Sequence, residues 1–218
     1  IDQPDVFSLC NMKPILLQGH ERAITQICYN REGDLLFSSA KDTEPSVWFT
    51  INGERLGTLK GHNGAVWCID VDWNTQHVVT GSGDNTCKIW DCSTGSLLHS
   101  LASETAVRSC SFSFDGNIVM MATDKAMGYP SSLSIVDIRD NEQMSSKGSK
   151  NIWKMFVKDI SKITKALWGP LSETIITGHE DGEVCLFDAS SGARVKSVTE
   201  HTAQIMDMQM YKDRTMLI

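Results

Sequence analysis

The residues of this sequence that could do chemistry are histidines, aspartates and hydroxyl side chains that recur in one order. A Gly-His pair is followed by a serine or threonine, an aspartate and a tryptophan, in residues 19–48 and again in residues 61–90. A histidine beside an aspartate could act as a general base. Alternatively, the four side chains could hydrogen-bond in series and satisfy the polar groups inside a sheet. We favour this structural role for His20, Ser38, Asp42 and Trp48, and for His62, Thr80 (or Ser82), Asp84 and Trp90.

Another histidine-rich and acidic stretch, GHEDGE at residues 178–183, could suggest a metal site. It falls where the neighbouring units carry SGDN and AKDT, so we interpret it as a polar turn between two strands. The histidines show no H-E-x-x-H spacing, and the sequence contains neither a Walker motif nor a G-x-S-x-G elbow. We therefore predict no catalytic, cofactor-binding or metal-binding residue.

The elements that must position these residues are short strands in a repeated unit. Each unit is about 40 residues long and shows four short strands joined by tight turns. This pattern is typical of a β-propeller blade. The sequence predicts an all-β propeller with blade units at about 19–60, 61–102, 103–158 and 159–200, and a partial unit at 201–218.

The third and fourth units depart from the pattern. Ser103 stands at the histidine position of the third unit, and Val136 stands at its tryptophan position. The polar stretch at 141–151 predicts a long exposed loop within that unit. The fourth unit keeps only Thr177 and Asp181 of the hydrogen-bonding set, to which we assign the same structural role.

Composition narrows the function classes. A net charge of -7 argues against a broad nucleic-acid surface, which requires a basic face, although a local basic patch is compatible with it. The seven cysteines form no C-x-x-C pair, which predicts free thiols in a reducing compartment. The sequence has no apolar run of about 18 residues. We expect neither membrane insertion nor sequence-specific nucleic-acid binding.

The repeats resemble the WD-repeat superfamily, and longer stretches resemble one family within it. These stretches are similar to the I subunits of eukaryotic translation initiation factor 3, and the resemblance runs from Met12 to the end. Residues 1–11 have no counterpart in that family and are interpreted as an extension. The stretches are MKPILLQGHER (12–22), YNREGDLLFSSAKD (29–42), NGERLGTLKGHNGAVWC (52–68), ATDKAMGY (122–129) and ALWGPLSETIITGHEDGE (166–183).

The resemblance implies a seven-bladed propeller, of which about four and a half blades are present, in a non-catalytic cytoplasmic scaffold subunit without a cofactor. It implies docking on the B subunit, through the C-terminal region of B, and association with the G subunit. The complex would act on the small ribosomal subunit during initiation and mRNA scanning. In such propellers an N-terminal strand, here PILLQ, completes the last blade, so we expect a truncated form or a portion of a longer subunit.

Two other interpretations remain open. One is a WD-repeat adapter in signalling or in ubiquitin-ligase substrate recognition. Its W-D-x-R docking end has its nearest match in VDIR at 136–139, which lacks the tryptophan. The other is a truncated paralogue without function.

Overall fold

The computed structural model of the 218-residue chain describes residues 14–139 and 161–210, and the backbone of 151–156. The expected extension at 1–11 lies outside the described residues, as does the expected loop at 141–151 apart from Asn151. Among the described residues, no helix has the length and apolar character needed to cross a membrane.

Four antiparallel sheets of four strands make up the described structure, which confirms the all-β prediction. The first sheet contains β1 (Ile24–Tyr29), β2 (Leu35–Ala40), β3 (Ser46–Phe49) and β4 (Arg55–Thr58). The second contains β5 (Val66–Val71), β6 (His77–Ser82), β7 (Thr86–Asp91) and β8 (Leu97–Ala102). The third contains β9 (Val107–Phe112), β10 (Ile118–Thr123), β11 (Ser132–Asp137) and β12 (Asn151–Phe156). The fourth contains β13 (Ile163–Trp168), β14 (Thr174–His179), β15 (Glu183–Asp188) and β16 (Arg194–Thr199), with the short 3-10 turn η1 (Pro170–Ser172) between β13 and β14.

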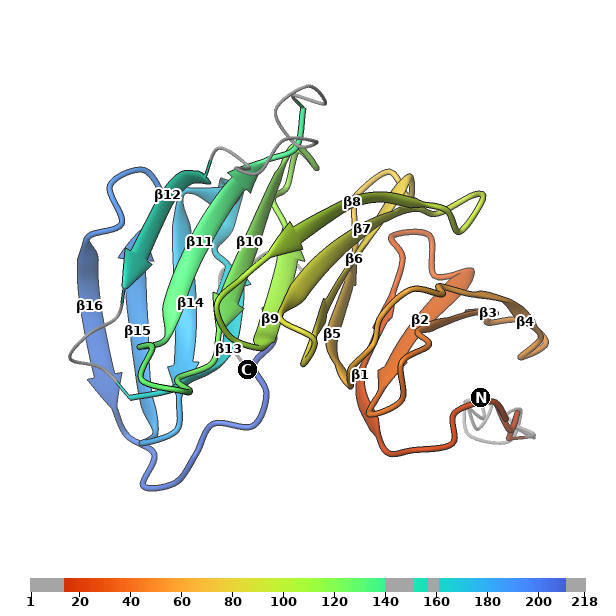
Figure 1. Ribbon diagram of the computed structural model, residues 1–218, viewed down its shortest axis with the longest axis horizontal. Helices are drawn as coiled ribbons and strands as arrows, with labels where there is room; N and C mark the ends of the chain where they lie inside the picture. Colours follow the sequence, from red (N-terminus) through yellow and green to blue (C-terminus); the bar gives the residue numbers. More distant parts are fainter. Residues whose placement is uncertain (1–13, 140–150, 157–160, 211–218) are drawn as a thin grey trace, which may run out of the picture.

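The sheets fan out side by side (Figure 1), and each sheet keeps its strands in chain order. The first strands of successive sheets, β1, β5, β9 and β13, contact one another in that sequence. They therefore form the inner side of the fan, and the fourth strands form the outer edges. This is the blade arrangement of a propeller.

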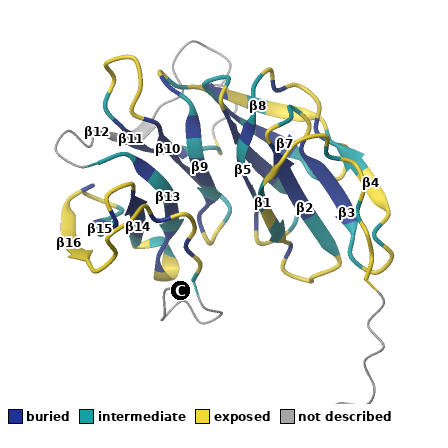
Figure 2. Ribbon diagram, turned by 90° about the horizontal axis from the view of Figure 1, so that it is seen from below, coloured by how far each residue is buried: buried dark blue, intermediate teal, exposed yellow. Residues whose placement is uncertain are grey.

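Apolar layers between neighbouring sheets hold the fan together. Successive side chains of a strand point to opposite faces, so one strand can supply two layers. Val78 of β6 packs in the layer between the first and second sheets, whereas Val79 packs between the second and third. Met120 of β10 reaches the layer between the third and fourth sheets, while Val119 faces the second sheet. Figure 2 shows the consequence: the middle strands are buried, whereas β4 and β16 carry exposed residues.

Two expected strands are not observed in the described residues. The PILLQ segment, residues 14–18, forms no strand, and Ile15 and Leu17 instead lie against Gly53 in the turn between β3 and β4. Residues 201–209, where the fifth unit was expected to open with a strand, are also irregular. Ile205 and Met208 of this segment are nevertheless buried. The backbone N–H of Ile205 donates to the carbonyl of His179, at 3.2 Å, which ties the segment to β14.

Candidate interaction surface

The second sheet brings together all four residues of its predicted hydrogen-bonding set. The indole N–H of Trp90 donates to Thr80 Oγ1 at 2.8 Å, and Thr80 Oγ1 lies 2.7 Å from His62 Nε2. His62 Nδ1 lies 2.9 Å from Asp84 Oδ2. Since the hydroxyl accepts from the indole, its own proton goes to Nε2, and Nδ1–H donates to the carboxylate. A neutral imidazole therefore satisfies every member of the set.

Burial and hydrogen bonding set the charges of this group. Burial lowers the pKa of His62 from its ordinary value, despite the hydrogen bond to Asp84. Burial alone would raise the pKa of Asp84, but hydrogen bonds from Thr86, the Asn63 N–H and His62 outweigh it and lower that pKa to about 2. The imidazole is thus neutral and the carboxylate ionised near neutral pH.

The first sheet repeats this geometry. Ser38 accepts from the Trp48 indole at 2.7 Å and lies 2.7 Å from His20 Nε2. His20 Nδ1 lies 2.8 Å from Asp42. Each set joins the segment before the first strand to the second strand, the following turn and the third strand. A hydrogen-bonded chain closed in this way supports the structural role that the sequence indicated.

The third sheet replaces two members of the set, the hydroxyl residue and the tryptophan, by apolar side chains. Met121 occupies the position that Thr80 has in the second sheet. Met121 pairs with Cys110 and Ser134 of its neighbouring strands, and Thr80 pairs with the equivalent residues Ile69 and Lys88. Val136 stands at the tryptophan position, as predicted, so the hydroxyl acceptor and the indole donor are lost together. Replacing both partners of a buried hydrogen bond by apolar groups is nearly neutral, whereas losing one is costly.

The fourth sheet contains a histidine that the sequence interpretation misplaced. His179 is fully buried at the end of β14 and does not lie in the turn that follows, which corrects the interpretation of GHEDGE as a turn throughout. Its Nε2 lies 2.8 Å from Thr177 Oγ1, and its Nδ1 lies 3.0 Å from the carbonyl of Ser161. Asp181 remains in the turn and accepts from the backbone N–H of Glu183. In the complete sets the histidine links the hydroxyl to the aspartate, whereas the two ring nitrogens of His179 reach Thr177 and the carbonyl of Ser161, so no observed hydrogen bond links this ring to Asp181.

No metal centre is formed by the described residues, because no three His, Cys, Asp or Glu side chains there are placed to hold an ion. The histidines of the two complete sets already use both ring nitrogens. His62 is only 5% exposed, so a substrate has little access to its ring.

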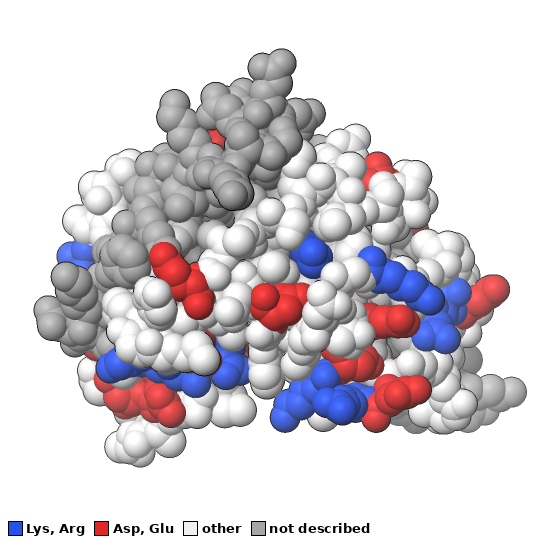
Figure 3. All heavy atoms as spheres, in the orientation of Figure 1, with Lys and Arg blue, Asp and Glu red and all other residues white. Residues whose placement is uncertain are grey.

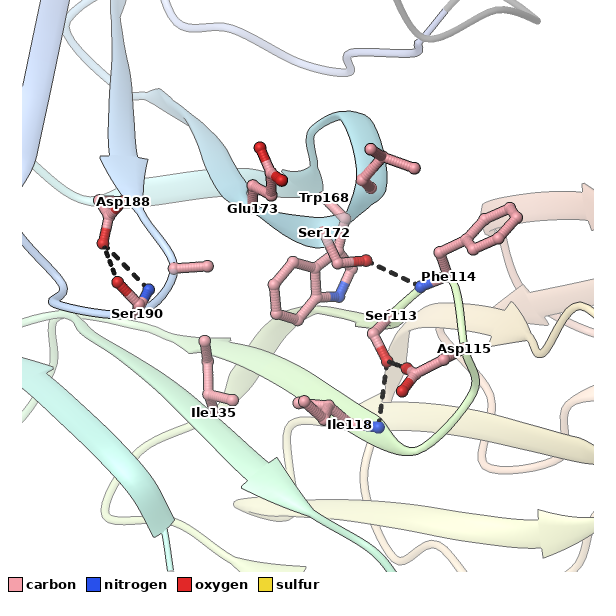
Figure 4. Close-up of a pocket in the computed structure, with 12 residues that line it drawn as sticks. Ser113, Phe114, Asp115, Ile118, Ile135, Trp168, Ser172, Glu173, Asp188 and Ser190 are labelled. Atoms are coloured by element: carbon pink, nitrogen blue, oxygen red, sulfur yellow. Dashed lines mark hydrogen bonds between the residues drawn. The ribbon is translucent and has the colours of Figure 1, made fainter.

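A groove of about 650 Å³ opens between the third and fourth sheets, where β9 turns into β10 and β13 into β14. Figure 4 shows the Trp168 ring at its centre, with Ile118 and Ile135 below the ring. The Trp168 indole donates to the carbonyl of Ser111 at 3.2 Å, which fixes the ring between the sheets. The floor is therefore apolar and preformed.

The groove continues into a row of exposed side chains in equivalent turns. The turn between the first and second strands presents Arg31, Trp73, Phe114 and Leu171 in the four successive sheets. The Arg31 guanidinium lies 4.4 Å from the Trp73 ring centre, and the Trp73 and Phe114 rings are 4.9 Å apart. The Phe114 N–H donates to Ser172 Oγ at 2.8 Å, which joins the third turn to the fourth.

A basic cluster lies at the opposite ends of the inner strands. Arg108, near the start of β9, stacks 4.2 Å above the Trp67 ring, and Lys41 lies 5.8 Å from the same ring. Arg108 and Lys162 share the buried carboxylate of Asp124 at 2.7 and 3.1 Å. The sequence interpretation missed this cluster. On the face drawn in Figure 3, basic and acidic side chains are interspersed, which gives no continuous basic surface there.

The fold and the repeated hydrogen-bonded sets define a WD-repeat protein of the β-propeller class. The EIF3I family model matches residues 12–218. The chain is 56% identical, over 207 residues, to eukaryotic translation initiation factor 3 subunit I from Taeniopygia guttata and from Homo sapiens, and 55% identical to that from Xenopus tropicalis. The matched region covers 95% of this chain and 63% of each relative. The chain belongs to the family of initiation factor 3 I subunits.

Proposed function

We propose that the chain works as a non-catalytic interaction subunit of eukaryotic translation initiation factor 3. Family membership carries this proposal, because the family model matches residues 12–218 and the identity to I subunits is 56% over 95% of the chain. The exposed apolar groove and the aromatic row are consistent with a protein that binds other proteins.

The proposal includes specific partners. The chain docks on the B subunit through the C-terminal region of B, associates with the G subunit, and supports assembly of the complex on the small ribosomal subunit and mRNA scanning. It acts in the cytoplasm without a cofactor. The hydrogen-bonded sets contribute to this function only by holding the first two blades rigid.

Affinity purification of the endogenous protein tests the proposal. The B and G subunits are expected to co-purify in stoichiometric amounts and to stay bound on sucrose-gradient fractions that contain the small ribosomal subunit. Recovery without these subunits would favour the truncated paralogue. Recovery with a ubiquitin-ligase scaffold would favour the adapter, and either result would overturn the proposal.

A further inference from the structure

The groove between the third and fourth sheets has the floor of a docking site for a large apolar side chain. Trp168 is only 6% exposed and Ile135 only 3%, yet both residues face the groove (Figure 4). Phe114 and Leu171 stand beside the floor and are 42% and 72% exposed. Exposed apolar side chains gathered around a preformed apolar floor are typical of a binding site.

The rim of the same groove is acidic. Hydrogen bonds from Ser113 hold the pKa of Asp115 below its ordinary value, and hydrogen bonds from Ser190 and its neighbour lower the pKa of Asp188 to about 2. The carboxylate of Glu173 takes no hydrogen bond or ion pair from the described residues. No lysine or arginine is among the described residues that line the groove. Three negative charges thus surround the floor without a local counter-charge in its lining.

We propose that this groove docks a segment of a partner protein in which a large apolar residue is flanked by lysine or arginine. The apolar side chain packs on Trp168, and its basic neighbours pair with Glu173 and Asp188 at the rim of the groove. A nucleic acid fits poorly because its phosphates would face the carboxylates. The inference rests on the proposed function only in taking the partner to be a protein.

Hydrogen bonds hold the rim of the groove in place, which supports its assignment as a docking site. Asp188 Oδ1 accepts hydrogen bonds from the two serines that follow it, so the carboxylate is fixed before a partner arrives. The link between Phe114 and Ser172 fixes the two turns against each other. Binding to fixed groups loses less conformational entropy than binding to mobile ones.

Peptide binding to the full-length protein tests the proposal. The probe is a fluorescein-labelled peptide in which leucine and phenylalanine alternate with lysine, and its counterpart carries glutamate in place of lysine. Fluorescence anisotropy is expected to show binding of the lysine peptide only. Glu173→Lys should weaken that binding roughly threefold to tenfold, because it replaces an attraction by a repulsion. Leu171→Asn should weaken it about tenfold through lost apolar contact, and asparagine tolerates the left-handed backbone at this position.

Glu200→Lys is the matched control. It makes the same charge change at an exposed residue that follows β16, at the opposite end of the fourth sheet from Asp188. Its affinity for the lysine peptide should equal that of the unchanged protein. Equal binding of the two peptides, an unchanged affinity in Glu173→Lys, or an equal loss in Glu200→Lys would each overturn the proposal.

The peptide-binding test of the groove can fail or succeed independently of the proposed function. A Glu173→Lys protein that still co-purifies with the initiation factor subunits, but no longer binds the lysine peptide, supports the groove assignment and leaves the function intact. An unchanged protein that binds the peptide but purifies without those subunits supports the groove and refutes the function.

Discussion

Replacing Thr80 by valine tests whether the hydrogen-bonded set stabilises its blade. Thr80 is fully buried, and its hydroxyl both accepts from the Trp90 indole and donates to His62. Valine has nearly the same shape, so the change removes the hydroxyl without opening a large cavity. It leaves two buried polar groups unsatisfied, each at a cost of about 1–3 kcal/mol. The free energy of unfolding should therefore fall by about 2–6 kcal/mol.

A double-mutant cycle with Trp90→Phe separates this mechanism from loss of packing. In the Trp90→Phe background no indole N–H is left without an acceptor, so Thr80→Val should cost about 1–3 kcal/mol less than it does alone. The third sheet shows the same compensation, because Met121 and Val136 replace the hydroxyl and the indole together.

Urea denaturation followed by circular dichroism measures each step of the cycle. Thr199→Val, on the exposed strand β16, is the control and should change the free energy of unfolding by less than about 0.5 kcal/mol. A cost below about 1 kcal/mol for Thr80→Val would refute the reasoning. Additive effects of the two substitutions would refute it as well, because unrelated sites add within about 0.5 kcal/mol.

Three further predictions follow from the same structure. The free energy of unfolding should fall as the pH drops below about 6.5, because histidine takes up a proton in the unfolded chain while burial lowers the pKa of His62 in the folded one. It should fall again between about pH 4 and 2, where Asp84, whose pKa is lowered to about 2 in the folded protein, takes up its proton at lower pH than in the unfolded chain. Urea titrations should show a smaller fall for Asp84→Asn, because Asp91 and Asp188, with pKa values also lowered to about 2, still contribute. Gly182→Ala should destabilise the protein more than Gly33→Ala in thermal unfolding, because both residues have positive φ but only at Gly182 would a Cβ clash with a backbone carbonyl oxygen, that of His201. Iodoacetamide at pH 8 should alkylate Cys92 more than about tenfold faster in urea than in the folded protein, since burial raises its pKa to about 11; equal rates by mass spectrometry would contradict this.

Sequence reasoning could locate the first two hydrogen-bonded sets because every member recurs at the same place in both units. His62, Thr80, Asp84 and Trp90 each have a counterpart in the first sheet, and the geometry is the same in both. The all-β class could also be predicted from the sequence, because the alternating apolar pattern and the turns between strands repeat in each unit.

His179 could not be found in this way because it reaches the set from a different position. Its place in β14 corresponds to Ser82 in β6, two residues after the threonine, and not to the segment before the first strand. Residues two apart in a strand share a face, so the ring still reaches Thr177. A histidine at this position, in a unit without the usual Gly-His pair, was the available signal.

The groove could not be predicted from the sequence, for a different reason. Its rim residues Asp115, Glu173 and Asp188 come from two turns and the end of β15, in two sheets, and their proximity depends on how those sheets pack. No local pattern encodes that packing. The available hint was Trp73 and Phe114, large apolar residues in turns where small polar residues are expected.

The direction of the inner strands explains why the two ends of the fan differ in chemistry. Because β1, β5, β9 and β13 each open a blade, equivalent residues of successive units gather at one end of the fan. The residues around the starts of these strands place Arg108 against Trp67, whereas the turns after their ends place Phe114 against Trp73. One turn position, varied from unit to unit, thus becomes a continuous surface, and the apolar layers between the sheets hold together the blades that carry it. Changes in that turn can alter the partner without altering the fold, because the turn lies outside the apolar layers between the sheets.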